Sequence, residues 1–223
     1  VVNTPHNPTG RVFTKEEISL IAELCITHDA WAITDEIYEH IRYAGGHHPI
    51  ATWPGMRERT VTISGLSKTF SCTGWRLGYA IAPAEQSQAI RKVHDFLTVG
   101  APAPLQAAGA VGMAFGPDYY NHIALDYRAR RDVIVHALEE AGFKFSIPEG
   151  AYYVLADFSD LSALPDDEFA RWLTGEIGVA PVPGSSFYHE PALGRKLVRF
   201  AFCKKLETLE RAGERLANVR ASV

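Results

Sequence analysis

A lysine and an arginine in this sequence stand in a setting where chemistry can be expected of them. Lys68 lies between two small polar residues in SGLSKTFSCTGWRLGY, residues 64–79, and Arg76 follows eight positions later beside a glycine-containing turn. A lysine that loses its proton can act as a nucleophile or a general base, and burial near positive charge promotes that loss. Most lysines are solvated, so a chemical role for Lys68 depends on the elements that position it.

Two further polar residues each follow a short stretch that reads as a strand. Asn7 comes just after VVN, Asp35 comes directly after AWAIT, and Lys68 comes a few residues after TVTIS. If these strands are parallel, all three residues fall on the carboxyl edge of one sheet, where doubly wound folds bind ligands. Taken singly, each residue has an explanation that involves no ligand. Asn7 is a residue that favours turns, Asp35 could cap a helix, and Lys68 could be a solvated charge. Three such residues at one sheet edge are less expected by chance than any one of these residues alone.

Arg199 poses a different question, because it lies in LVRFAFC, a predicted strand that is apolar on both alternating faces. One face must therefore accept a guanidinium between Leu197 and Ala201, and a buried charge requires a partner. The planar guanidinium fork matches a carboxylate through two hydrogen bonds. That carboxylate is either part of a bound ligand or an internal Asp or Glu.

Composition excludes several classes of function. The chain has 223 residues, 47% of them hydrophobic, and a net charge of −4 from interspersed acids and bases, so no basic stripe is offered to nucleic acid. Its longest apolar runs are too short to cross a membrane. The widely spaced cysteines favour free thiols in a cytoplasmic protein over disulfides or a metal site: Cys25, Cys72 and Cys203.

The first half of the chain reads as alternating strands and helices. Thr14 and Glu17 have capping-box spacing and predict a helix from about residue 14 to 28. Short apolar or β-branched runs predict strands at 30–34, 60–64 and 78–82. This order favours an α/β fold with a mostly parallel sheet and flanking helices.

The second half has a different character. A long amphipathic helix is predicted from about 118 until Gly142. It is followed by strands FKFSI, AYYVLADF, GVAPV and LVRFAFC, a helix near 169–175, and a closing helix that contains Leu206 and Val219. We therefore expect one domain over residues 1–118 and, over residues 119–223, an interdomain helix with a smaller α+β domain.

Four pieces of the sequence, in order, carry a resemblance: NTPHNPTG, TDEIY, SGLSKTFSCTGWRLGY and LVRFAF. Together they resemble the class I/II aminotransferases, which are pyridoxal-phosphate enzymes of fold type I, and the resemblance extends over essentially the whole chain. It implies pyridoxal 5'-phosphate as cofactor, a homodimer, and a role in amino acid metabolism. It also implies that residues 1–118 are the C-terminal portion of a large cofactor-binding domain.

The resemblance implies the central roles for Lys68 and Asp35. The lysine at the place of Lys68 forms a Schiff base with the cofactor and moves the proton at the substrate α-carbon, which suits a flexible amine with a lowered pKa. Asp35 matches the carboxylate that keeps the pyridine nitrogen protonated, so that the ring works as an electron sink.

The remaining site residues are also implied by resemblance. Asn7 and Tyr38 match the pair that hydrogen-bonds the phenolic oxygen of the ring, and Arg76 matches the arginine that binds the phosphate. Arg199 matches the residue that grips the substrate α-carboxylate. Many relatives have a phosphate-binding serine where this chain has Gly65, so phosphate binding is not assigned there.

The reaction expected from this resemblance is amino-group transfer from an amino acid to a 2-oxo acid through a Schiff base on Lys68. The sequence context favours a neutral, aromatic or sulfur-containing amino acid, with Tyr152 near the substrate by resemblance. The same residues could serve a carbon–sulfur β-lyase, or the aminotransferase-like ligand domain of a transcription regulator, and a degenerate dimerisation domain is a further alternative. We also expect these residues to be the C-terminal part of a longer enzyme and to be weakly active alone.

Overall fold

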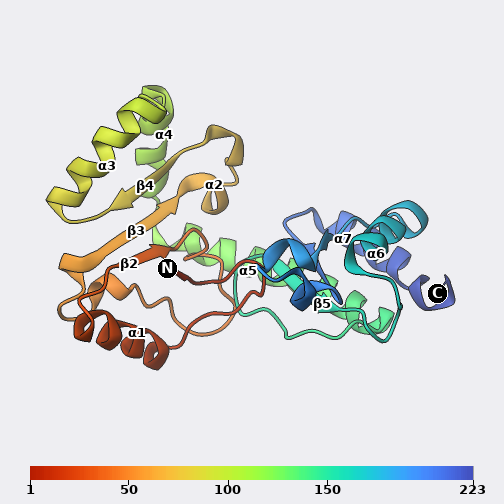
Figure 1. The fold of residues 1–223 in the computed structure, drawn as a ribbon. Helices are drawn as coiled ribbons and strands as arrows, with labels where there is room; N and C mark the ends of the chain where they lie inside the picture. Colours follow the sequence, from red (N-terminus) through yellow and green to blue (C-terminus); the bar gives the residue numbers. More distant parts are fainter. Residues whose placement is uncertain (223) are drawn as a thin grey trace. The chain divides into compact units, whose positions relative to one another are not determined.

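The computed structural model describes residues 1–222, which form two compact units (Figure 1). The first unit comprises residues 1–6 and 12–124, and the second comprises residues 7–11 and the chain from 125 onward. The division falls within the helix α5 (Pro117–Ala141). The boundary expected at residue 118 lies near the start of this helix, and residues 7–11, expected in the first domain, group with the second unit.

The first unit contains a four-stranded sheet of β1 (Val2–Asn3), β2 (Ala32–Asp35), β3 (Thr60–Gly65) and β4 (Gly78–Ile81). The strands lie in sequence order; β1, β2 and β3 are parallel, and β4 is antiparallel to β3. The predicted α/β class, with a mostly parallel sheet and flanking helices, is therefore confirmed. The predicted strands at 30–34, 60–64 and 78–82 are correct to within two residues.

Helix α1 (Lys15–Thr27) covers one face of this sheet, as Figure 1 shows. The predicted capping box is present: Glu17 N donates to Thr14 Oγ1 at 3.2 Å, and Thr14 N donates to Glu17 Oε2 at 2.9 Å. These bonds satisfy two amides that a helix N-terminus would otherwise leave unpaired. The apolar side of α1 joins a buried cluster of Val2, Ile18, Ala22, Cys25, Ala32, Ile50 and Met56.

The rest of the first unit consists of short turns and two helices that the sequence analysis did not anticipate, α3 (Ala84–Leu97) and α4 (Ala103–Met113). None of the described side chains of α3 is buried, and α4 buries only two glycines. Neither helix therefore packs an apolar face on a core, and it is such a face that produces a periodic pattern in the sequence. The short elements are η1 (Ile50–Thr52), η2 (Arg57–Arg59), α2 (Leu66–Thr69) and η3 (Thr73–Trp75).

The first unit also exposes apolar side chains to an unusual degree. Ile33 and Ile63, on the sheet face opposite α1, are 42% and 44% exposed, and Phe96 of α3 is 94% exposed. Parallel strands are normally covered on both faces. Exposed apolar surface of this kind is typical of interaction sites.

The second unit contains an antiparallel sheet of β5 (Tyr153–Asp157), β7 (Leu197–Ala201) and β6 (Val182–Pro183), in the order β5-β7-β6. Two predicted strands are largely wrong. FKFSI contributes only the single bridge between Lys144 and Asp157, and GVAPV contributes only its last residue, Val182, to the two-residue strand β6. GVAPV contains one proline and is followed by another, and proline cannot donate to a sheet ladder, which limits that strand.

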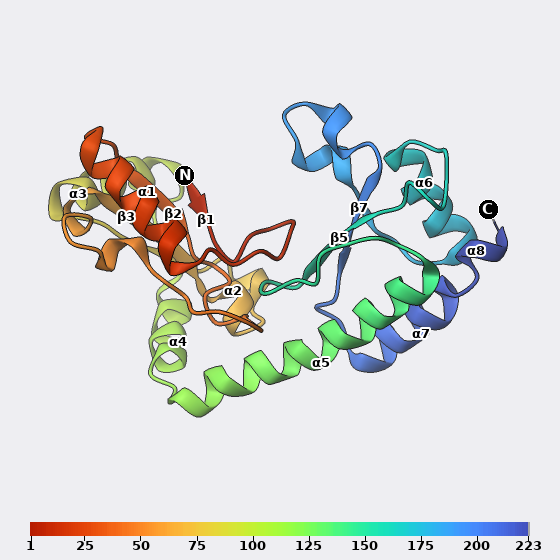
Figure 2. The ribbon, with the colours of Figure 1, turned by 90° about the horizontal axis from the view of Figure 1, so that it is seen from below.

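Helices pack on the core of this second unit (Figure 2). Helix α5 ends, as predicted, immediately before Gly142, which has φ +91°. The closing helix was predicted to be continuous, but it ends at Leu216 and a separate turn follows, so that prediction is wrong in its last part. The elements are α6 (Asp166–Trp172), which continues as η4 (Leu173–Ile177), then η5 (Gly184–Phe187), η6 (Pro191–Gly194), α7 (Leu206–Leu216) and α8 (Val219–Ser222).

The core of the second unit is aromatic. Phe158 and Phe169 are fully buried and stacked, with ring centroids 4.0 Å apart and planes 13° apart. Leu138 of α5 and Val198 of β7 are also fully buried. This core holds β7, and with it Arg199, in a fixed position.

Candidate active site

Three strand ends meet at one edge of the first sheet. Asp35 at the end of β2 pairs with Ile63 of β3, and Gly65 at the end of β3 pairs with Gly78 at the start of β4. The carboxyl ends of β2 and β3 and the amino end of β4 therefore share this edge. Lys68 lies three residues after the end of β3 and Arg76 two residues before the start of β4, so the structure brings both to the edge that carries Asp35.

Asp35 and Tyr38 belong to the turn that leaves β2. The Ile37 amide donates to Asp35 Oδ1 at 3.2 Å, and Asn3 Nδ2 donates to the Asp35 backbone oxygen at 3.1 Å. Tyr38 is buried and Asp35 is half-buried. The turn therefore holds a carboxylate in a defined orientation, as a partner for a protonated ring nitrogen requires.

Lys68 lies on the short helix α2 and is half-buried. The helix is anchored where it begins, because Leu66 N donates to Leu77 O at 3.1 Å and links the start of α2 to the segment before β4. A Cβ at Gly65 would lie only 3.1 Å from Ile37 Cδ1 and from Leu77 O. The packing around Gly65 therefore leaves little room for a side chain at this position.

Arg76 adopts a backbone conformation that is uncommon for a residue with a side chain. Its φ is +52° and its ψ is +42°, in the left-handed region, which costs on the order of 1 kcal/mol or more. The guanidinium is exposed, and its Nη1 donates to Thr73 O at 3.1 Å. Strain of this kind concentrates at ligand-binding sites, and an exposed guanidinium is a suitable partner for a phosphate.

In the second unit, Arg199 and Asn7 contact one another although they lie far apart in the sequence. Arg199 Nη1 donates to Asn7 Oδ1 at 2.8 Å, which sets the orientation of the Asn7 amide. The guanidinium lies 4.1 Å from the ring centre of Tyr153 and 4.6 Å from that of Phe187. Arg199 is half-buried, and these two rings flank its charge.

The Nε atom of Arg199 favours a ligand carboxylate over an internal Asp or Glu as the partner of this guanidinium. This atom is buried and has no hydrogen-bond acceptor among the residues that the structure describes. No Asp or Glu of the described chain forms an ion pair with Arg199, so the internal carboxylate is absent there. An unsatisfied guanidinium N–H is costly, and a ligand carboxylate would satisfy it.

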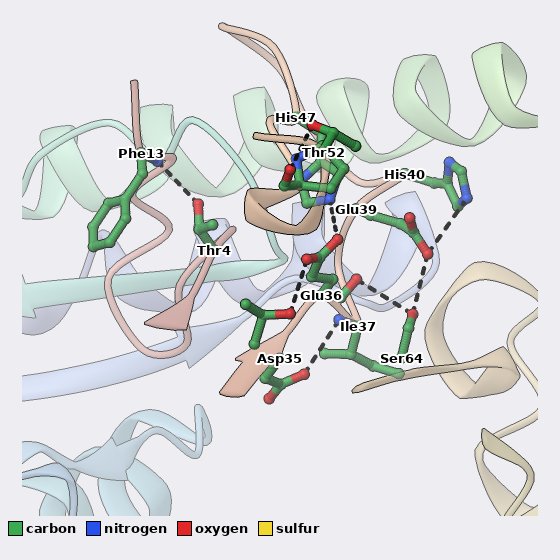
Figure 3. A network of polar contacts seen from close by, with 12 residues as sticks. Thr4, Phe13, Asp35, Glu36, Ile37, Glu39, His40, His47, Thr52 and Ser64 are labelled. Atoms are coloured by element: carbon green, nitrogen blue, oxygen red, sulfur yellow. Dashed lines mark hydrogen bonds and ion pairs between the residues drawn. The ribbon is translucent and has the colours of Figure 1, made fainter. Parts of the chain in front are cut away.

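Next to Asp35 lies a polar network around Glu36 and Glu39 that the sequence analysis missed (Figure 3). Glu36 is buried; its Oε1 accepts from Thr34 Oγ1 at 2.9 Å, and its Oε2 lies 2.6 Å from His47 Nε2. Glu39 Oε1 accepts from Ser64 Oγ at 3.1 Å. The only signals in the sequence were an acid beside Asp35 in TDEIYEH and the histidine pair in GGHHPI.

Two groups next to this network have shifted pKa values. Burial raises the pKa of Tyr79, whose hydroxyl donates to Glu39 Oε1 at 3.2 Å. Burial also lowers the pKa of His40 below its ordinary value, although the nearby Glu39 carboxylate opposes that shift. Both shifts favour the neutral form of a partly buried side chain.

The three cysteines are free thiols, with Cys25 buried and the other two half-buried. Among the described residues, no helix combines the length and the apolar character that a membrane crossing requires.

Comparison with known proteins places the chain in a family. Residues 1–216 match the family described as aminotransferase class I and II. The chain is 41% identical over 217 residues to the methionine aminotransferase of Escherichia coli, covering 97% of this chain and 56% of that protein. It is 38% identical over 235 residues to human kynurenine–oxoglutarate transaminase 3, covering 96% of this chain and 51% of that protein.

Solved structures agree with this result. The structure of N-succinyldiaminopimelate aminotransferase from Mycobacterium tuberculosis matches with a TM-score of 0.93 and 38% identity, over 98% of this chain and 57% of that one. The chain therefore belongs to the class I and II aminotransferases, with the fold type I architecture, and the family uses pyridoxal 5'-phosphate. It spans about half the length of the curated relatives that it matches.

The residues at the sheet edge fit that cofactor chemically. An amine for its aldehyde, a carboxylate for its ring nitrogen and a guanidinium for its phosphate are all present at one edge of the sheet, in Lys68, Asp35 and Arg76. Tyr38 belongs to the same turn as Asp35 and supplies a phenol. Asn7 belongs to the second unit, where Arg199 sets the orientation of its amide.

Proposed function

We propose that the protein transfers an amino group from an amino acid to a 2-oxo acid with pyridoxal phosphate held on Lys68. The observation that carries this proposal is that Lys68, Asp35 and Arg76 lie at one edge of the same sheet. When bound, the cofactor supplies an electron-withdrawing ring that stabilises negative charge on the substrate α-carbon.

Each residue then has a defined task. Lys68 Nζ holds the cofactor aldehyde and is the base that moves the proton at the substrate α-carbon. Asp35 keeps the ring nitrogen protonated, and Arg76 binds the phosphate through charge-assisted hydrogen bonds. Tyr38 donates to the phenolic oxygen of the ring, as does Asn7.

Arg199 binds the substrate α-carboxylate, and its buried, unsatisfied Nε supports this role. Substrate binding there would add an acceptor to a guanidinium already oriented by Asn7 and by two aromatic rings. We infer that the preferred substrate is a neutral amino acid with an aromatic or sulfur-containing side chain. The names of the methionine and kynurenine aminotransferases among the relatives support this choice.

We further propose that the active form is a cytoplasmic homodimer. Free thiols suit a reducing compartment, and the exposed apolar side chains of α3, including Phe96 and Leu97, are a surface that a second copy can cover. A monomer of the full-length protein in sedimentation at micromolar concentration would rule out the dimer.

The absorbance spectrum of the full-length protein with pyridoxal phosphate tests the central assignment. We expect a visible band from cofactor bonded to the protein, and we expect Lys68→Ala and Lys68→Arg to lack it. Lys92→Ala, on the exposed helix α3, is the matched control and should keep the band. A band that survives Lys68→Ala shows that another residue holds the cofactor, and release of ammonia and pyruvate without amino transfer shows a lyase instead.

A further inference from the structure

The buried carboxylate of Glu36 has a place in the fold that the proposed catalytic roles do not use. The side chain of Glu36 is only 5% exposed, and that of its partner His47 is 10% exposed. Carboxylates are seldom buried, because removing the charge from water is costly unless hydrogen bonds and an opposite charge compensate for it. Here Thr34 and His47 provide one contact to each carboxylate oxygen.

His47 depends on this contact as much as Glu36 does. Its Nδ1 atom is buried and has no hydrogen-bond partner among the described residues, so the observed polar contact of the ring is the one to Glu36. The distance between Glu36 Oε2 and His47 Nε2 is 2.6 Å, which is that of a short hydrogen bond. Each of the two side chains is therefore kept in position by its hydrogen bond to the other.

The pair adjoins the turn that carries Asp35 and Tyr38, because Glu36 is itself part of that turn. Side chains alternate along a strand, so Thr34 and Glu36 face one way and Asp35 faces the other, and Figure 3 shows the two carboxylates pointing apart. The Glu36 amide also donates to Ile63 O at 2.8 Å, which ties this residue to β3.

A second acid holds the other end of the same turn. Glu39 Oε1 accepts from Ser64 Oγ of β3 and from the hydroxyl of Tyr79 on β4. Hydrogen bonds of Glu39 therefore connect the turn to the sheet, and the hydrogen bond of Glu36 to His47 connects it to the loop that contains His47. Replacing His47 removes only the contact to Glu36 and leaves the contacts of Glu39 in place. The effect of the replacement therefore reports on the Glu36–His47 contact alone.

A metal ion is a poorer explanation of this cluster. The ligand atoms of Glu36, Glu39 and His47 lie within 4.8 Å of one another. However, Glu36 and His47 bond directly to each other, and Glu39 is occupied by two hydroxyl groups. A metal bound through Glu36 Oε2, His47 Nε2 and Glu39 Oε1 would have to displace these contacts.

We propose that Glu36 and His47 are a positioning pair that keeps the Asp35–Tyr38 turn in the geometry required to bind the cofactor ring. This inference rests on the proposed function. Neither residue touches the cofactor in this scheme; both act through Asp35 and Tyr38. Side chains that orient metal ligands typically affect affinity or activity by about 10–100-fold, and we expect an effect of the same order here.

The test compares His47→Ala, His47→Asn and His47→Gln in the full-length protein. The glutamine amide can reach Glu36 and replace the lost donor, whereas the asparagine amide is shorter and alanine has no donor. Asp29→Asn is the control, because it removes an ion pair with Arg59 in the same unit at a carboxylate that is 97% exposed.

Three readouts separate positioning from general destabilisation: the Kd for pyridoxal phosphate, the pH at which its protein-bound visible band titrates, and the melting temperature. We expect His47→Ala and His47→Asn to weaken cofactor binding at least tenfold and to move the pH of the band's transition. His47→Gln should stay within about threefold of wild type, as should Asp29→Asn.

The outcomes are distinguishable. Equal behaviour of the glutamine and asparagine variants, whether both are normal, both impaired or both unfolded, overturns the positioning pair. A loss of melting temperature with unchanged Kd and unchanged band transition also overturns it, since that pattern describes a purely structural contact. A wild-type protein without the band overturns the proposed function, and this inference with it; a wild-type band with normal His47 variants overturns this inference alone.

Discussion

Replacing Arg199 with lysine is the sharpest test of how the proposed enzyme recognises its substrate. The change keeps the positive charge but removes the planar fork, so a carboxylate that accepts two hydrogen bonds would accept only one. It also removes the donor to Asn7 Oδ1 and the guanidinium that lies over Tyr153 and Phe187. The variant therefore separates fork geometry from charge.

The size of the effect follows from the lost bond. A hydrogen bond to a charged group contributes about 1.5–3 kcal/mol. Because about 1.36 kcal/mol changes a rate tenfold, kcat/KM for an amino acid should fall by about 10- to 150-fold. Part of any loss could come from Asn7, whose amide is oriented by the same guanidinium, so a reference substrate is needed.

A substrate without the carboxylate provides that reference. L-Methionine and 3-(methylthio)propylamine differ only in the carboxylate group, and amino transfer from both can be followed in single-turnover spectra. We expect Arg199→Lys to reduce the preference for methionine over the amine by the full factor, while transfer from the amine changes little. An equal loss for both substrates would show that Arg199 does not contact the carboxylate and would refute the assignment.

Two further predictions concern stability. The pKa of His40 is lowered in the folded state by burial, so its contribution is present above the unfolded pKa of about 6.5 and is lost as the pH falls through the folded pKa. His40→Gln should therefore flatten the loss of melting temperature between about pH 7 and pH 5, and an unchanged slope would contradict this. Phe169→Ala removes a fully buried ring that is stacked on Phe158, and should cost about 3–5 kcal/mol in urea unfolding; a cost below about 1 kcal/mol would mean that the site collapses around the cavity.

Local signals in the sequence were enough for several elements of the fold. The Thr14–Glu17 capping box and the stop at Gly142 depend on residues close together in the chain, and both are found as predicted. The strand assignments fared worse in the second unit. Whether FKFSI forms a strand depends on a partner elsewhere in the chain, and it pairs only through the Lys144 bridge.

The helices α3 and α4 were missed for a related reason. A periodic pattern reveals a helix when one face packs on a core, and α3 buries none of its described side chains while α4 buries only glycines. Without a buried apolar face, the residues of such helices give no periodic signal that a sequence analysis can detect.

The candidate site divides in the same way. The sequence by itself determined which residue types are present and in which order, and parallel strands predicted Asn7, Asp35 and Lys68 at one sheet edge. The structure has Asp35 and Lys68 at that edge, whereas Asn7 groups with the second unit. Only the tertiary structure decided that Arg76 is held in a left-handed conformation, that Arg199 has a buried N–H without an acceptor, and that His47 closes on Glu36. Each of these three features depends on contacts between distant parts of the chain or on the space around a side chain. The spacing of residues along the sequence contains no information about such contacts or such space.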